Sequence, residues 1–327
     1  VGGNLTALDT IDGGAGTDTL ITSATIASAT ILGGVSNVEV ISASAAATIT
    51  LAANISATTF NFAGTGDQVL NLKAGYTDSV TVILTGDGGG DKVDNAGVTE
   101  ANTTLLVKAD FTDITAGTSL AGGTGTDTLE LRQTNGTATV DGDITGFDAV
   151  TITDKAGDNT SDITLTMTAY ATAATIDASA LDAGENDTLT LTSGTAAFTI
   201  KGGDGVSTIV GGNLGDTITG NGGADVINGG TGLDNISGGA ANDSITASTE
   251  AAFSTTLGTD TVDGGAGTDT LAFSAAATLS TAETVNISNV EVLSLTTGST
   301  LTVNDAFLAA NPGLVIQPGA TSTIKAS

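Results

Sequence analysis

Carboxylates and glycines repeat together every nine residues between positions 202 and 246. Nonapeptides follow one another there without a break: GGDGVSTIV, GGNLGDTIT, GNGGADVIN, GGTGLDNIS and GGAANDSIT. The sixth position is aspartate in all but the first, which has Ser207; the others have Asp216, Asp225, Asp234 and Asp243. A hard cation such as calcium prefers carboxylate oxygens and the carbonyl oxygens that glycine-rich loops leave exposed. The spacing therefore predicts a series of calcium sites.

The eighth position of every nonapeptide is isoleucine: Ile209, Ile218, Ile227, Ile236 and Ile245. A short strand with one inward apolar residue after each glycine-rich turn is typical of a parallel β-roll. Two nonapeptides form one coil, so we expect loops 18 residues apart to stack, with Asp225 over Asp243 and an ion between them. Ser207 would weaken the site that it shares with Asp225. A calcium-free glycine-rich turn or a disordered linker is the alternative.

Single copies of the nonapeptide occur outside this block. They cover residues 13–21, 122–130 and 264–272, with a looser version at 86–94, and acidic half-matches precede the first and the last. The candidate metal ligands are the aspartates and loop glycines of all these repeats: Asp9, Asp12, Gly14, Gly16, Asp18, Asp87, Asp91, Asp94, Gly123, Gly125, Asp127, Gly203, Asp204, Gly205, Gly212, Asp216, Gly223, Asp225, Gly230, Gly232, Asp234, Gly239, Asp243, Asp260, Asp263, Gly265, Gly267 and Asp269.

A longer unit encloses the single copies. An apolar segment follows each: VSNVEVI at 35–41, a weaker ITGFDAVTI at 144–152, and ISNVEVL at 287–293. Each unit is thus a calcium loop, variable strands and a strand that we expect to be buried. We divide the chain into residues 1–121 and 122–201, each a β-rich module with one loop, the calcium roll 202–272, and a C-terminal strand unit and cap at 273–327.

Composition excludes several classes of function. Seven Lys plus Arg against 36 Asp plus Glu give a net charge of −29, which argues against nucleic acid as a partner. The chain has no cysteine and no histidine, so disulfides, zinc sites and Ser-His-Asp triads cannot form within it. No run of about 20 apolar residues suggests direct membrane insertion. Because the sequence opens on Val1, we expect it to be a piece of a longer chain.

Alternating stretches between the loops predict β-strands, for example residues 66–72, 80–84, 103–107, 163–167 and 188–191. Some follow acidic turns, as at 185–187, which could be degenerate calcium loops or ordinary Asx turns. One short helix is expected at 304–310, capped by Asn304 or Asp305. The predicted fold is all-β: an elongated, right-handed parallel β-roll or β-solenoid with calcium-binding nonapeptide loops and additional strand modules.

In these nonapeptides the chain resembles the repeats-in-toxin (RTX) proteins. The resemblance implies export by type I secretion and folding on calcium outside the cell. RTX repeats occur in toxins, enzymes, adhesins and surface-layer proteins, so the repeat alone does not define the function. The alternation of GTDTL loops and NVEV strands is most similar to the lattice-forming region of RTX-type surface-layer (S-layer) proteins. Departures from the repeat pattern occur at Ser207, Leu214, Asn221 and Ala241.

We therefore expect a calcium-dependent structural protein of the cell surface, not an enzyme. Several calcium ions would make each subunit rigid and bridge it to other copies of itself in a lattice. A region outside this chain would anchor the lattice to the cell. The alternatives are an RTX adhesin or extender segment, and the noncatalytic RTX carrier region of a larger secreted enzyme.

Overall fold

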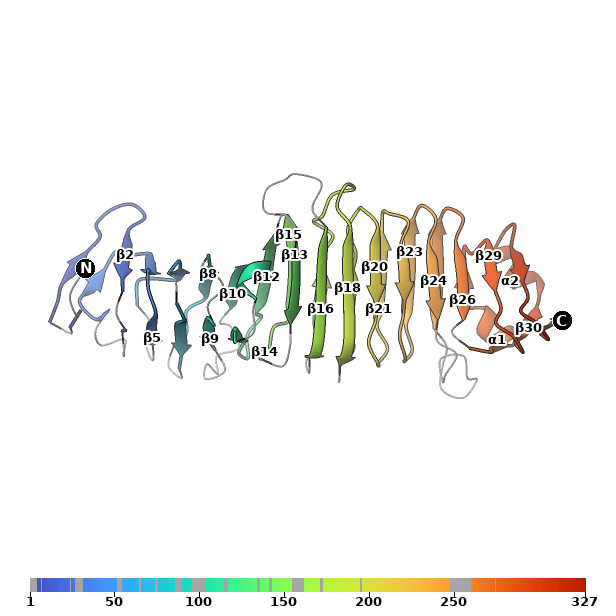
Figure 1. The fold of residues 1–327 in the computed structure, drawn as a ribbon, viewed down its shortest axis with the longest axis horizontal. Helices are drawn as coiled ribbons and strands as arrows, with labels where there is room; N and C mark the ends of the chain where they lie inside the picture. The colour runs from blue at the N-terminus through green and yellow to red at the C-terminus, as the bar shows by residue number, and fades with distance from the viewer. Residues whose placement is uncertain are drawn as a thin grey trace. The chain divides into compact units, whose positions relative to one another are not determined.

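The chain is an all-β protein whose parallel sheets form a β-solenoid, as the repeats predict (Figure 1). The computed structural model describes residues 5–6, 8–23, 25–26, 32–51, 55–64, 66–73, 76–85, 90–95, 104–114, 117–133, 136–140, 143–154, 162–170, 173–194, 196–247, 260–273 and 275–327. Asp87, one of the candidate ligands, lies outside them. The chain divides into two compact units, one of Val1–Thr151 with Tyr170–Thr172 and the other of Ile152–Ala169 with Ala173–Ser327.

In the first unit, most strands pair with the next strand but one along the chain, which is the arrangement of a coil. One series is β2-β4-β6-β8-β10-β12, a second is β5-β7-β9-β11-β14, and β1 pairs with β3. The strands are β1 (Ile11–Asp12), β2 (Thr19–Thr22), β3 (Val35–Ser36), β4 (Val40–Ala43), β5 (Ala47–Leu51), β6 (Thr59–Phe62), β7 (Gln68–Leu72), β8 (Val80–Leu84), β9 (Lys92–Asp94), β10 (Leu105–Asp110), β11 (Ser119–Ala121), β12 (Thr128–Gln133), β13 (Gly136–Val140), β14 (Ile144–Thr145) and β15 (Ala149–Asp154), with a 3-10 helix at Phe111–Asp113.

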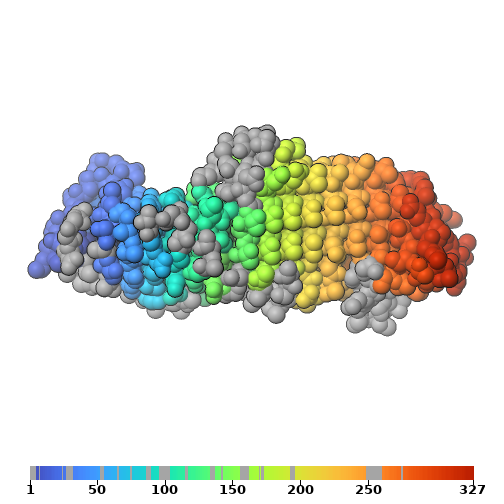
Figure 2. Space-filling model, viewed as in Figure 1, coloured from blue at the N-terminus to red at the C-terminus, as the bar shows by residue number. Residues whose placement is uncertain are grey.

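The second unit repeats this arrangement. Its series are β17-β19-β21-β23-β25-β28, β16-β18-β20-β22-β24-β26-β29-β31 and β27-β30-β32. The strands are β16 (Ile163–Tyr170), β17 (Thr175–Asp177), β18 (Asp187–Gly194), β19 (Thr199–Lys201), β20 (Ser207–Val210), β21 (Thr217–Asn221), β22 (Val226–Asn228), β23 (Asn235–Ala240), β24 (Ser244–Ala247), β25 (Thr261–Ala266), β26 (Thr270–Phe273), β27 (Thr278–Leu279), β28 (Ile287–Ser288), β29 (Val292–Ser294), β30 (Thr300–Val303), β31 (Val315–Gln317) and β32 (Thr323–Ala326). Figure 2 shows the coils of this unit packed directly against one another.

The register of the nonapeptide strands confirms that two repeats make one coil. Ile209 aligns with Ile227 and Ile227 with Ile245, while Ile218 aligns with Ile236, and all these pairs are parallel. All the isoleucines of the eighth position are at most 1% exposed. Because side chains alternate across a strand, the residues on either side of each isoleucine face outward, and the loops stack as the isoleucines do.

The core of the first unit contains larger side chains than the isoleucine columns. Phe60, Phe62, Tyr76, Phe111 and Phe147 are fully buried there. The strands predicted from alternation are confirmed: β7, β8 and β10 here, and β16 and β18 in the second unit. Alternating burial along each of β7 and β8 shows the one-sided packing that produced the sequence pattern.

The predicted C-terminal helix is confirmed as α2 (Asp305–Ala310), and Asn304 caps it by accepting a hydrogen bond from the Phe307 N–H (2.8 Å). The sequence analysis missed one turn of helix, α1 (Thr281–Thr284). Ser280 and Glu283 form a capping box there, a signal that the Ser-x-x-Glu spacing does contain. Within the described residues, neither of these helices has the length or the apolar run needed to cross a membrane.

Candidate metal centre

Stacking of the coils brings the predicted aspartates into two columns. The register of β18, β20, β22, β24, β26 and β29 aligns the residues of the first column: Asp187, Ser207, Asp225, Asp243, Asp269 and Glu291. The register of β21, β23 and β25 aligns those of the second column: Asp216, Asp234 and Asp260. The expected placement of Asp225 over Asp243 and of Asp216 over Asp234 is confirmed. The two series are called the carboxylate columns below.

In every column carboxylate except Asp187, one oxygen accepts a backbone hydrogen bond from the preceding coil. The Asp225 N–H donates to Asp243 Oδ1 at 2.8 Å, and the Asp216 N–H donates to Asp234 Oδ1 at 2.8 Å. The same hydrogen bond forms where the two aspartates are 26 residues apart instead of 18: the Asp243 N–H donates to Asp269 Oδ1 at 2.7 Å. Ser207 donates its N–H to Asp225 Oδ1 at 2.7 Å and its hydroxyl to Asp187 Oδ2 at 2.8 Å. These bonds satisfy backbone donors at the start of each strand.

In most column aspartates the second oxygen is left without a hydrogen bond, whereas Asp216 Oδ2 accepts the Gly212 N–H at 2.8 Å. Within the described residues, Oδ2 is buried and has no hydrogen-bond partner in Asp225, Asp234, Asp243, Asp260 and Asp269. In the nonapeptides, this Oδ2 atom lies beside the first glycine of the same repeat. A Cβ atom placed on Gly220 would stand 2.2 Å from Asp225 Oδ2 and 2.4 Å from the carbonyl oxygen of Gly238, one coil further on. The absence of a side chain thus lets a carboxylate oxygen and a carbonyl oxygen from adjacent coils approach the same place.

Burial makes these carboxylates costly to ionise. The pKa of Asp225 and of Asp234 is raised to about 7, mainly by desolvation and also by neighbouring aspartates of the column, although a backbone hydrogen bond lowers it. Burial also raises the pKa of Asp187, Asp243 and Asp260 to about 6. Desolvation raises the pKa of Asp127, Asp216 and Asp269 as well. A buried charge of this kind needs a cation or a proton.

No basic side chain supplies that cation in the part of the chain that the structure describes. The ion pairs found there involve other carboxylates: Lys73 with Asp94, Lys108 with Glu130, Arg132 with Asp110 and Lys201 with Asp177. The same residues contain no cluster of three carboxylate side chains close enough to hold a metal. A cation here would therefore take several of its ligands from loop carbonyls. Calcium accepts such a mixed oxygen set, so the residues present fit it.

The loop glycines serve two different purposes. Some have positive φ angles, which only glycine adopts easily: Gly14, Gly16, Gly230, Gly232, Gly239, Gly265 and Gly267. Asn221 and Ala241, which depart from the repeat pattern, also have positive φ, of 77° and 74°. Other loop glycines do not: Gly203, Gly205, Gly212, Gly223 and Gly123. Gly125 lies in the same loop as Gly123, directly before β12.

Close packing explains Gly205 and Gly223. A Cβ atom on Gly205 would stand 1.9 Å from the Glu185 carbonyl oxygen, and one on Gly223 would stand 2.0 Å from the Gly205 carbonyl oxygen. Gly212 is different, because a Cβ atom there would make only an ordinary contact, at 3.6 Å from Asp216 Oδ2. The repeat pattern alone did not distinguish these roles.

The candidates outside the columns have varied surroundings. Asp18 and Asp127 occupy the sixth position of their nonapeptides, and Asp18 Oδ2 is buried without a partner in the described residues. Asp91 Oδ1 accepts the Gln68 N–H at 2.8 Å, and Asp94 pairs with Lys73 at 2.8 Å. Asp9 accepts the Thr6 N–H at 2.7 Å. Asp204 is exposed in the first loop of the tandem block.

Four carboxylates of this arrangement were missed as ligands by the sequence analysis. Asp187 heads the first column, Glu291 continues it, and Glu39 and Asp148 hold Asp18 and Asp127 in the same way. The acidic turn at 185–187 and the two NVEV segments contained the signal. The number of residues in each coil varies, however, so the alignment across coils was not visible in the sequence.

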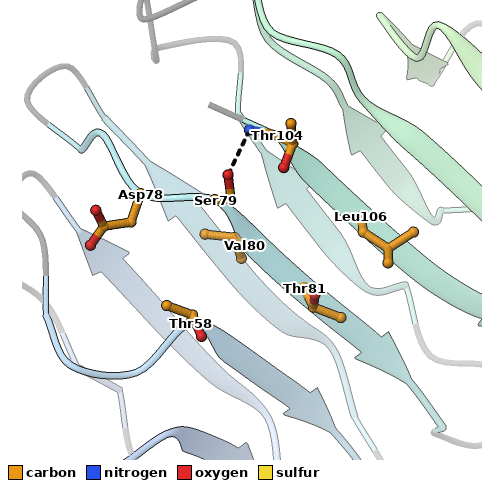
Figure 3. A pocket seen from close by; sticks show the side chains of 7 residues that line it. All are labelled: Thr58, Asp78, Ser79, Val80, Thr81, Thr104 and Leu106. Atoms are coloured by element: carbon orange, nitrogen blue, oxygen red, sulfur yellow. Dashed lines mark hydrogen bonds between the residues drawn. The ribbon is translucent and has the colours of Figure 1, made fainter. Parts of the chain in front are cut away.

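A shallow hollow in the first unit is another concave feature found among the described residues (Figure 3). Thr58, Asp78, Ser79 and Thr104 line it together with strands β8 and β10, and the Ser79 hydroxyl accepts a hydrogen bond from the Thr104 N–H at 3.3 Å. Hydroxyl groups and one carboxylate form no nucleophile-and-base pair of a known catalytic kind.

Comparison with known proteins leaves the site to be interpreted on its geometry. No family model, no curated protein and no solved structure matches this chain.

Proposed function

We propose that this chain is an extracellular structural protein that folds on binding several calcium ions and assembles with copies of itself into a surface-layer lattice. The observation that supports calcium binding best is the set of buried Oδ2 atoms in the carboxylate columns, which have no partner in the described residues. Calcium between stacked loops would neutralise these oxygens. Carbonyl oxygens such as that of Gly238 would complete its coordination shell. The role is noncatalytic.

The proposed location follows from the affinity such sites have for calcium. A chain with uncompensated carboxylates in its core is unfavourable where calcium is scarce and becomes stable where calcium is abundant. Calcium outside the cell would then complete the fold after type I export, as the resemblance to RTX proteins implies. In the lattice, calcium would also bridge neighbouring copies, and a region not in this chain would attach the lattice to the cell.

Calcium binding is tested first, on the full chain by calorimetry and circular dichroism. Chelation should unfold at least residues 202–272, because their columns hold the buried carboxylates. Asp225→Asn should lower the number of bound ions, since the amide keeps an acceptor for the Ser207 N–H but loses the charge. Asp305→Asn is the matched control: its carboxylate is exposed at the start of α2. Circular dichroism unchanged in excess chelator would sink the proposal.

Assembly is tested by electron microscopy of the purified chain in millimolar calcium. We expect ordered sheets that disappear on chelation and return when calcium is restored. If the chain remains a monomer at every calcium concentration while still binding the ion, the lattice is wrong. The adhesin or extender segment would then be the better explanation.

A further inference from the structure

Two places far apart in the sequence share one arrangement of side chains. Each combines the loop of a single nonapeptide with the segment Ser-Asn-Val-Glu-Val of the next coil, at residues 36–40 and 288–292. We refer to these as the SNVEV segments. In the first copy the polar residues are Asp12, Asp18, Asn37 and Glu39, and in the second they are Asp263, Asp269, Asn289 and Glu291.

The hydrogen bonds of the two copies coincide. The Asp18 N–H donates to Glu39 Oε2 at 2.8 Å, and the Asp269 N–H donates to Glu291 Oε2 at 2.8 Å. The side-chain amide of Asn37 donates to Asp12 Oδ1 at 2.7 Å, and that of Asn289 donates to Asp263 Oδ1, also at 2.7 Å. Both asparagines are in the left-handed region, with φ of 50° and 52°. The hydrogen bond from its side-chain amide to the aspartate holds each asparagine in this uncommon backbone conformation.

Both copies place a carbonyl oxygen beside a carboxylate group, and in the C-terminal copy the two oxygens converge on one glycine. Asp269 is fully buried, and within the described residues its Oδ2 has no hydrogen-bond partner. A Cβ atom on Gly264 would stand 2.9 Å from this Oδ2 and 2.0 Å from the Asn289 carbonyl oxygen. In the other copy Asp18 Oδ2 is buried and equally unpartnered, and a Cβ atom on Gly13 would stand 2.0 Å from the Asn37 carbonyl oxygen. The turned asparagine thus presents its carbonyl beside the unpartnered carboxylate.

A third, incomplete copy shows which parts belong together. Gly146, with φ of 75°, replaces the asparagine, and Ala121 replaces the aspartate that would bind its amide. The Asp127 N–H still donates to a carboxylate, Asp148 Oδ2, at 2.9 Å. Asp127 Oδ2, however, accepts the Gly123 N–H at 2.5 Å, so no unpartnered oxygen remains. The Asp–Asn pair and the unpartnered oxygen are therefore lost together.

We propose that each SNVEV segment closes a second kind of calcium site against the loop of the preceding coil. In the C-terminal copy the ligands are Asp269 Oδ2, the Asn289 carbonyl oxygen and the Glu291 carboxylate. In the N-terminal copy they are Asp18 Oδ2, the Asn37 carbonyl oxygen and the Glu39 carboxylate. Asp12 and Asp263 are positioning residues that hold the asparagines. The inference rests on the calcium binding proposed above. In such a site the SNVEV segment, which contains no glycine, takes the place of the second glycine-rich loop.

The test is calcium titration calorimetry on the full chain carrying Glu291→Gln. Glutamine keeps an acceptor for the Asp269 N–H but removes the negative charge. We expect one site to lose affinity by at least about tenfold, the usual effect of disturbing one member of a metal site. Glu39→Gln should weaken calcium binding at the N-terminal SNVEV site in the same way, and the double variant should weaken both sites. Asp305→Asn, which removes an exposed charge, should leave the titration unchanged.

The outcomes separate the two proposals. If the unaltered chain binds no calcium, both fail. If it binds calcium and a folded Glu291→Gln variant gives the same titration, the SNVEV site alone is wrong. A variant that unfolds in low calcium but refolds at a higher calcium concentration supports the site. One that stays unfolded at every calcium concentration, with Asp305→Asn folded, contradicts it.

Discussion

In most column aspartates the two carboxylate oxygens have opposite surroundings. In Asp243, Oδ1 accepts the Asp225 N–H, whereas Oδ2 is buried and unpartnered in the described residues. A hydrogen bond to the charged form favours ionisation, and burial opposes it, with burial the larger effect. The same side chain therefore supports the coil through one atom and needs a cation or a proton at the other.

The elevated pKa values predict how pH acts on the metal-free chain. The folded pKa is about 7 for Asp225 and Asp234 and about 6 for Asp187, Asp243 and Asp260, all above the unfolded value of 3.8. The folded state thus binds more protons, so its stability is greatest at low pH and is lost as pH rises through about 6–7. Protein freed of metal on a chelating resin should contain a larger folded fraction at pH 5 than at pH 8, as measured by far-ultraviolet circular dichroism.

Calcium should reverse this trend, because the ion competes with protons for the same oxygens. Saturating calcium should increase the folded fraction more at pH 8 than at pH 5. A folded fraction that rises from pH 5 to pH 8 without calcium would contradict the assignment of these pKa shifts to the columns.

At the scale of the element, the nonapeptide loop depends on how closely successive coils approach. A Cβ atom on Gly238, the first residue of its repeat, would stand 2.3 Å from Asp243 Oδ2 and 2.4 Å from the Gly264 carbonyl oxygen. The second residue of another repeat, Gly212, has room for a methyl group. Glycine is thus required at the first position by packing between coils and can be replaced at some others.

This difference gives a matched pair of variants. Gly238→Ala should destabilise the folded, calcium-bound chain by about 1–3 kcal/mol, the range found for overpacked sites. Gly212→Ala should change the free energy of unfolding by no more than about 0.5 kcal/mol. Urea denaturation in saturating calcium measures both. Equal effects of the two substitutions would show that the first glycine is not placed as described.

At the scale of the whole molecule, the question is whether calcium acts through specific sites or only by reducing a net charge of −29. Salt screens exposed charges over a Debye length of about 3 Å at 1 M, but it screens buried charges much less. The columns are buried, so general screening should not replace the ion.

We therefore expect the metal-free chain at neutral pH to remain unfolded in 1 M sodium chloride and to fold in millimolar calcium. Magnesium at the same concentration should be a poor substitute, because it requires a nearly ideal octahedral set of ligands. Far-ultraviolet circular dichroism follows all three conditions. Folding in sodium chloride alone would indicate that net repulsion, and not the column sites, keeps the chain open.

Much of the coil was predictable because it is local. The eighth-position isoleucines, the two-repeat coil and the stacking of Asp225 over Asp243 follow from a strict period of nine residues and the alternation of side chains in a strand. The cap at Asn304 is local in the same sense. The one-turn helix α1 was missed because four residues are too few to show a helical period.

The sequence by itself determined the all-β class, the short coils and the aspartates most suited to a cation, since each depends on residue types a few positions apart. Only the tertiary structure decided which aspartate oxygens are left without a hydrogen bond. It also brought Glu39, Asp148, Asp187 and Glu291 into line with repeat residues that lie 20 to 22 positions away in the sequence. The lengths of those coils differ, so the partners become neighbours only when the strands pair.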